Sequence, residues 1–424
     1  MSPGPSRNVI LRIYAVAGTL VTLLLLSYAV PRMVDAWKQY PWDGKVDWIA
    51  ARAYVEHRNP YSPEELKKVK LDGLGHPPTT SFWWLPFARY DLKEISPLVG
   101  HVIVFAMFVM FMMLAWELRW PLPPLSAVIA FLTVMCSSWM YYHLYLVQVS
   151  GFIAFLYFMS WYLLRRDEEI ASGLLLGCAC TFKLFPGLLV FLLLLGRRWR
   201  AVFAAGAAYV VIFVIMTARF GLEAWPQYVA TEGIITNYWI GNAHNASIFG
   251  VALRILRPAC RGAGVSRPAG TAIAMVIGLS LLAVSLWVCR RAIKERRLEL
   301  PFVLFATLSV FMNPFTFEHY FALLTFPLAV VLSAWRGAWL RGMPRRRWAA
   351  IGALLAGVVA FLAFNFRWQD EVSWKEHHAL RHLLEVTNWI HMPLLIAACA
   401  LLIDWSEKKN ERLLPPPLPL PNAA

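Results

Sequence analysis

Apolar residues in this chain gather into long runs that short polar connectors separate. A run of roughly 17–23 mostly apolar residues can cross the hydrocarbon core of a bilayer as a helix. The pattern therefore predicts an all-α, polytopic transmembrane helical bundle with about twelve spans. We expect these spans near residues 9–30, 98–115, 124–142, 147–164, 170–186, 187–196, 201–218, 271–289, 300–315, 319–335, 348–366 and 386–404.

One apolar stretch, residues 170–196, is too long for a single span. Lys183 and the pair Pro186-Gly187 interrupt it, and a proline cannot continue the hydrogen bonding of a helix. We expect two short or tilted helices joined by a tight break, because protein must bury irregular backbone at membrane depth. The first run has no clear cleavage site, so we expect a retained helix and not a removed signal peptide.

The composition agrees with a membrane protein. Of the 424 residues, 59% are hydrophobic and 15% are charged, against roughly 25% charged in an ordinary soluble domain. A soluble protein could not hide so much apolar surface. The 20 Trp and 15 Tyr also suit a membrane, because amphipathic rings favour the headgroup region.

The formal net charge of +15 could suggest a nucleic-acid partner. However, Lys and Arg lie mainly in short clusters between apolar runs, which is the pattern that the positive-inside rule gives to cytoplasmic connectors. We therefore predict no nucleic-acid binding. The basic connectors are Arg165-Arg166, Arg197 to Arg200, 290–297 and 336–347, and they alternate with the nearly neutral connectors 141–146 and 316–318.

Placing the basic connectors in the cytoplasm puts both termini there. Residues 1–8 then form a cytoplasmic tail, 9–404 the transmembrane domain, and 405–424 a Pro-rich tail that we expect to be disordered after Leu413. Three longer segments lie outside under this topology, at 31–97, 219–270 and 367–385.

The first outer segment is predicted to be structured. Residues 42–57 read as a helix near the membrane face, and Asn59-Pro60-Tyr61 as a turn. Ser62-Pro63-Glu64-Glu65 has the residues of a helix start, with Ser as the cap and Pro at the first position. His76-Pro77-Pro78 is rigid and cannot begin a helix before its prolines. A loop of this length with its own helices is more than a connector.

Several short motifs occur in order along the chain. They are Asp47; Asn59-Pro60-Tyr61; His76-Pro77-Pro78; Gln148-Val149-Ser150-Gly151; Gly173 to Gly177, then Lys183-Leu184-Phe185-Pro186; Arg197-Arg198-Trp199; Asn245-Ala246-Ser247; and His319-Tyr320. In this set the chain resembles glycosyltransferase family 87, polytopic enzymes of the GT-C type that take a sugar from a polyprenyl phosphate. It departs from the family at Val147-Gln148-Val149-Ser150, where the family often has Gly-Gln-x-Asn, and at His76, where an aromatic residue is common.

The resemblance implies a catalytic carboxylate on the first outer loop, and Asp47 is our first candidate. An inverting transfer needs a base to take the proton of the acceptor hydroxyl. Asp43 and then Asp72 are the reserve candidates. The alternative for Asp47 is an ordinary solvated side chain that helps to start a helix.

Other side chains are candidates for binding the donor phosphate or the substrate. A charge at Lys183 costs roughly 2.5–3.5 kcal/mol at mid-bilayer, so it either meets a lipid-linked phosphate or snorkels to the interface. His319 and Glu318 lie in a short outer turn, where the resemblance favours contact with the departing phosphate. Arg52 could also meet phosphate, or be an exposed helix residue. Tyr61, His76, Gln148 and Asn245 are candidates through the matching motifs alone.

His377, His378 and His382 have metal-ligand spacing, but we interpret them as part of a solvated loop, and we expect neither a metal nor a cofactor. The resemblance implies a polyprenyl-phosphate donor of mannose, or else arabinofuranose, with a glycan or glycolipid acceptor at the outer face of the plasma (inner) membrane. The rival is a transporter or lipid flippase, for which internal repeats are typical; none is evident between the halves.

Overall fold

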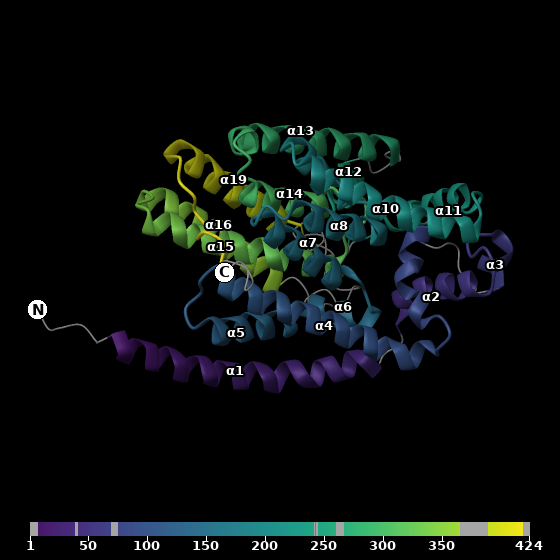
Figure 1. Ribbon diagram of the computed structural model, residues 1–424, viewed down its shortest axis with the longest axis horizontal. Helices are drawn as coiled ribbons and strands as arrows, with labels where there is room; N and C mark the ends of the chain where they lie inside the picture. The colour runs from purple at the N-terminus through teal and green to yellow at the C-terminus, as the bar shows by residue number, and fades with distance from the viewer. Residues whose placement is uncertain are drawn as a thin grey trace, which may run out of the picture.

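The computed structural model describes residues 7–38, 41–68, 75–240, 242, 245–259, 267–364 and 389–418. Within these ranges every regular element is helical (Figure 1). The α-helices are α1 (Arg7–Lys38), α2 (Trp42–Val55), α3 (Pro63–Lys68), α4 (Leu92–Glu117), α5 (Pro123–Met135), α6 (Ser138–Leu146), α7 (Ser150–Leu164), α8 (Glu169–Phe182), α9 (Gly187–Leu195), α10 (Trp199–Phe220), α11 (Ala224–Trp239), α12 (Ile248–Ala259), α13 (Arg267–Lys294), α14 (Glu299–Phe311), α15 (Thr325–Leu340), α16 (Arg345–Phe364) and α19 (His391–Lys409). Two 3₁₀ helices, η1 (Pro78–Phe87) and η2 (Glu318–Leu324), complete the set.

Several helices are long and apolar enough to cross a membrane. Five meet this condition alone, at Tyr14–Lys38, Leu92–Glu117, Trp199–Phe220, Pro268–Lys294 and Glu318–Leu340, and a bent pair would make a sixth. Shorter apolar helices lie at Ser150–Leu164, Glu169–Phe182 and Glu299–Phe311. The chain is thus a multi-pass, helical membrane protein. Of the twelve spans predicted from the pattern, the described residues support five or six by helix length and composition.

The span predicted at 124–142 is divided in the structure. α5 ends at Met135, and α6 leaves at a bend of 74°. Ser137 caps α6, because its Oγ accepts a hydrogen bond from the Met140 amide at 3.3 Å. The residues 141–146, predicted to be a connector, are therefore helical. α6 ends at Leu146, because the next residue, Val147, has a left-handed φ of 55°.

The predicted break at Lys183 is confirmed. α8 ends at Phe182, Lys183 is extended with φ −154° and ψ 146°, and α9 begins at Gly187. Two glycines let α8 pack closely on α10. A Cβ atom added at Gly173 would lie 2.1 Å from the Ala201 carbonyl oxygen, and one at Gly177 would lie 2.4 Å from that of Ala205. Close approach through small residues is typical of helix pairs in membranes.

The segment predicted to lie outside between the first two spans is attached to the end of α8. The predicted cap is confirmed, since Ser62 Oγ accepts from the Glu65 amide at 3.3 Å and α3 begins at Pro63. From η1, Thr80 Oγ1 donates to the Phe182 carbonyl at 2.8 Å, and Trp83 Nε1 donates to Thr181 Oγ1 at 2.9 Å. These bonds hold η1 directly beside Lys183.

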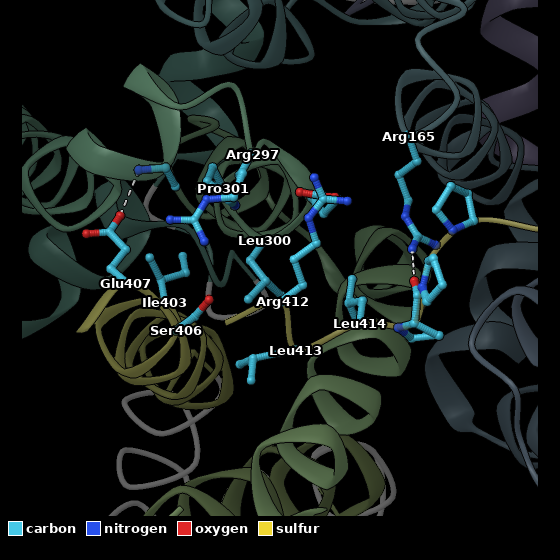
Figure 2. A pocket seen from close by; sticks show the side chains of 15 residues that line it. Arg165, Arg297, Leu300, Pro301, Ile403, Ser406, Glu407, Arg412, Leu413 and Leu414 are labelled. Carbon is cyan, nitrogen blue, oxygen red and sulfur yellow. Dashed lines mark hydrogen bonds between the residues drawn. The ribbon is translucent and has the colours of Figure 1, made fainter. Parts of the chain in front are cut away.

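The prediction of a disordered tail after Leu413 is wrong for residues 414–418. Leu413 and Leu414 belong to the buried core. The Pro415 carbonyl accepts a hydrogen bond from Arg165, and the Leu418 carbonyl accepts one from Arg166 Nη2 at 2.8 Å. Figure 2 shows this segment along one side of a pocket that Arg165, Arg297 and Leu300 also line. The tail is ordered because buried guanidinium groups need more acceptors than nearby carboxylates supply.

Candidate functional site

Two carboxylates lie one helical turn apart on α2. Asp47 is 4% exposed, and its Oδ1 lies 2.7 Å from Nδ1 of His76. His76 is held in turn by its backbone, because the buried Tyr61 hydroxyl donates to the His76 carbonyl at 2.9 Å. Asp47, His76 and Tyr61 therefore form one connected group between α2 and the start of η1.

Asp43 is partly buried, and it has a different partner. Its Oδ2 accepts a hydrogen bond from Gln148 Nε2, just before α7. Burial is the largest influence on Asp43 and raises the pKa of its carboxyl, as the Asp47 charge also does. His76, the Gln148 amide and Lys183 lower that pKa. Each of these groups is thus close enough to affect the Asp43 carboxyl.

Lys183 enters the cluster from the break between α8 and α9. It is 7% exposed, its Nζ donates to the Tyr320 hydroxyl at 2.5 Å, and it lies 4.3 Å from the centre of the Tyr320 ring. Among the described residues, no carboxylate lies within ion-pair distance of it. The side chain is buried between helices, so the snorkelling alternative does not describe it.

η2 brings His319 to the same place. The His319 ring is 6% exposed and its centroid lies 4.7 Å from that of Tyr320. The His319 ring interacts electrostatically with Lys183 most strongly, and more weakly with His143 and His76. The structure thus collects residues predicted from five separate parts of the sequence into one largely buried polar cluster: Asp47 and Asp43, His76, Gln148, Lys183 and His319.

The match to a known family decides the class of the protein. A family model described as glycosyltransferase family 87 matches residues 75–327, more than half of the chain. The chain belongs to glycosyltransferase family 87. No curated protein and no solved structure matches it.

Membership of this family makes the protein a membrane-embedded glycosyltransferase with a sugar donor and an acceptor. The matched range includes His76, Gln148, Lys183, Asn245 and His319. α2, with Asp43 and Asp47, precedes the matched range, so its carboxylates join the cluster by geometry alone.

Asn245 has a supporting position in this glycosyltransferase. Its amide nitrogen donates to the carbonyls of Ile240 at 3.0 Å and Pro314 at 2.8 Å. Its Oδ1 accepts from the amides of Ser247 at 3.1 Å and Thr316 at 3.0 Å. Both the nitrogen and the oxygen of the side-chain amide are therefore hydrogen-bonded. Asn245 stabilises the turn that precedes η2 and His319.

Arg52 and Glu318 lie at the edge of the described site. Arg52 is half exposed, pairs with Glu56 at 3.1 Å and stacks over Trp48. The structure describes no contact between Arg52 and the buried cluster. Glu318 is partly buried at the first position of η2, next to His319.

The sequence analysis missed His143. It is fully buried on α6, and its Nε2 accepts a hydrogen bond from the Gly151 amide at 3.3 Å. A Cβ atom at Gly151 would come within 2.9 Å of that nitrogen, so glycine is needed for this contact. The signal is a histidine inside the aromatic run 141–146, which the sequence pattern predicts to be a connector.

In the part of the chain that the structure describes, no group of three or more His, Cys, Asp or Glu side chains could hold a metal ion. Two predicted alternatives lie outside the described residues. They are the reserve carboxylate Asp72 and the histidines His377, His378 and His382.

Proposed function

We propose that this glycosyltransferase moves a single sugar from a polyprenyl-phosphate donor to a glycan or glycolipid acceptor, with inversion at the anomeric carbon. One observation carries the proposal. A buried carboxylate, Asp47, lies in the same polar cluster as a buried lysine that has no ion-pair partner among the described residues. An uncompensated buried cation is costly unless it meets an anion, and a phosphate leaving group supplies one.

The proposed reaction needs only side chains of this cluster. The acceptor oxygen attacks the anomeric carbon, and Asp47 takes the hydroxyl proton as the new glycosidic bond forms. The bond between the anomeric carbon and the phosphate oxygen breaks, and the electron pair leaves with the polyprenyl phosphate. Lys183 and His319 stabilise the negative charge of that phosphate.

The finer points of the proposal come from the resemblance and the charge pattern. The fold would be a GT-C bundle of about twelve spans, with its lipid donor between helices and its site facing outward from the plasma (inner) membrane. Mannose is the first sugar to test and arabinofuranose the second.

The decisive experiment replaces Asp47 by Asn. The amide keeps the shape of the side chain but cannot accept a proton at neutral pH, so transfer should fall by about 10²–10⁴, or about 2.7–5.4 kcal/mol of barrier. The measurement is transfer of radiolabelled mannose from polyprenyl-phosphate mannose in membranes. Folding is checked by thermal unfolding of the purified variant.

Asp43→Asn is the matched control, one turn away on the same face of α2. Because burial already favours the uncharged form of Asp43, an uncharged amide should retain most of the activity. A dead Asp43→Asn beside an active Asp47→Asn would place the base one turn earlier. Full transfer activity in both variants would show that neither carboxylate alone is the base, and the single-carboxylate mechanism would then be wrong.

A further inference from the structure

We infer that His76 is a positioning residue for the proton transfer: it holds one oxygen of Asp47 so that the other faces the acceptor hydroxyl. The inference rests on the proposed function of Asp47. It assigns His76 a different task from the phosphate or substrate contact that the sequence motifs suggested.

The contact itself is the first argument. His76 Nδ1 and Asp47 Oδ1 are 2.7 Å apart, and the Asp47 side chain is 6% exposed. A carboxylate accepts hydrogen bonds and cannot donate them when ionised, so Nδ1 carries the hydrogen in the pair with ionised Asp47. One carboxylate oxygen is thereby fixed. Asp47 Oδ2 remains to receive the proton.

The second argument is that His76 is itself fixed. Pro77, with φ −65° and ψ 155°, and Pro78 follow it directly and restrict the backbone on that side. Tyr61 holds the His76 carbonyl, and Asn59 Oδ1 accepts from the Tyr61 amide at 3.0 Å. Asn59 is anchored to α11 through Gln227 at 2.7 Å. The imidazole is therefore presented to Asp47 by a rigid support.

The neighbouring carboxylate shows what this contact adds. Asp43 occupies the equivalent place one turn earlier, but its partner is the amide of Gln148 and not an imidazole. Gln148 Oε1 is buried without a hydrogen-bond partner among the described residues, so that pair is open for a further donor. The structure thus gives the two carboxylates separate supports, and only Asp47 is held by a residue of the outer segment.

The proton balance is simple. The proton leaves the acceptor oxygen and bonds to Asp47 Oδ2, while the hydrogen on His76 Nδ1 stays in place. His76 forms and breaks no bond to the sugar. Its effect should appear in kcat, because a base displaced by about 1 Å can lose on the order of 10²-fold in rate.

The test compares three substitutions of His76 in the full-length, membrane-reconstituted protein. In His76→Asn the side-chain amide nitrogen can occupy the position of Nδ1 and donate to Asp47. In His76→Gln the longer side chain places the amide nitrogen nearer the position of Nε2. His76→Ala has no side-chain donor. We expect kcat within tenfold of wild type for His76→Asn, and about 100-fold lower for the other two. The KM for polyprenyl-phosphate mannose should change by less than threefold in all three.

A double variant tests whether His76 acts through Asp47. If it does, Asp47→Asn with His76→Ala should be no slower than Asp47→Asn alone, because groups that act as a unit are not additive. A tenfold further loss would overturn the inference. An equal loss of kcat in His76→Asn and His76→Ala would also overturn it. So would a raised KM for the donor with unchanged kcat in these variants, because that result indicates phosphate binding by His76.

These results separate the inference from the function on which it rests. An active Asp47→Asn refutes the proposed base, whatever His76 does. An inactive Asp47→Asn together with wild-type kcat in His76→Ala refutes only the role of His76. Thermal unfolding of each variant shows whether a low rate reflects loss of fold, and His76→Asn remains a near-isosteric comparison if His76→Ala does not fold.

Discussion

The side chains of the cluster differ from an ordinary helical core in how many of them can carry charge. Lys183 has one hydrogen-bond partner in the described structure, Tyr320, and that partner is neutral. The His319 ring lies beside the same tyrosine and makes no side-chain hydrogen bond to another described residue. Both therefore retain donors for an anionic ligand.

Lys183→Met should weaken donor binding more than catalysis. The substitution keeps length and apolar contacts but removes the charge, so a contact made equally in ground and transition states should be lost, at about 1.5–3 kcal/mol. The KM for the polyprenyl-phosphate donor should rise by roughly 10–100-fold with kcat nearly constant. Lys67→Met, at an exposed position of α3, is the control and should behave as wild type.

His319→Ala should lower kcat more than it raises the KM for the donor, which is the reverse of the effect expected for Lys183→Met. We expect a strong fall in kcat, because a ring at the start of η2 would meet the phosphate as it departs and its charge grows. Wild-type kinetics in both Lys183→Met and His319→Ala would show that neither residue binds the donor phosphate. Steady-state kinetics at several donor concentrations distinguish these outcomes.

The sequence could point to these residues, but not to their partners. Asp47 and His76 are 29 positions apart, and no local pattern connects them. Asn245 matched a motif, yet the structure uses its whole amide to hold a turn. His143 gave no motif, since its role depends on the close approach of Gly151. Such pairings depend on tertiary packing, which a single sequence does not reveal.

Among the helices, the contact of α8 with α10 determines where Lys183 lies. Gly173 and Gly177 put the α8 backbone against carbonyl oxygens of α10. Backbone atoms cannot rotate aside as a flexible side chain can. Any widening of this contact would move the end of α8, and with it Lys183 and the acceptors of Thr80 and Trp83.

Gly173→Ala should therefore destabilise the protein. The new methyl carbon would meet the Ala201 carbonyl oxygen at 2.1 Å, and overpacking of this kind costs typically about 1–3 kcal/mol. Gly206→Ala on α10 is the matched control, because a Cβ atom there has nothing within 4 Å. It should be neutral or slightly stabilising through helix propensity. Thermal unfolding in detergent measures both, and equal behaviour would contradict the packing argument.

Helix positions were easier to predict than helix ends. Apolar runs located the long helices, and the proline at 186 marked the break beside Lys183. The bend between α5 and α6 was missed because neither proline nor glycine marks it. Its only local signal is Ser137 as a cap, and a serine in an apolar run is also an ordinary helix residue.

Across the whole bundle, the polar cluster and the arginines lie at opposite ends of the same helix. α7 begins at Ser150, next to Gln148, and ends at Leu164, before Arg165. Its 15 residues span about 22 Å. If the basic clusters face the cytoplasm, the cluster with Asp47 therefore faces outward.

Cysteine labelling tests this orientation. In a background without reactive native thiols, Lys67→Cys should react with a membrane-impermeant reagent added outside intact cells. Lys294→Cys and Arg345→Cys should react only after permeabilisation, because the positive-inside rule puts their clusters in the cytoplasm. The reverse pattern would invert the topology and put the site on the inner face.

The contact between the C-terminal segment and Arg165 also affects the timing of assembly. The bonded residues are 250 positions apart, which at ribosomal rates corresponds to roughly 12–50 s of translation. Glu117 is made before both arginines and pairs with each of them. This carboxylate can hold them from the moment α7 is complete, while the carbonyls of Pro415 and Leu418 arrive only after α19. The basic end of the bundle is therefore finished late, long after the helices around it have been inserted.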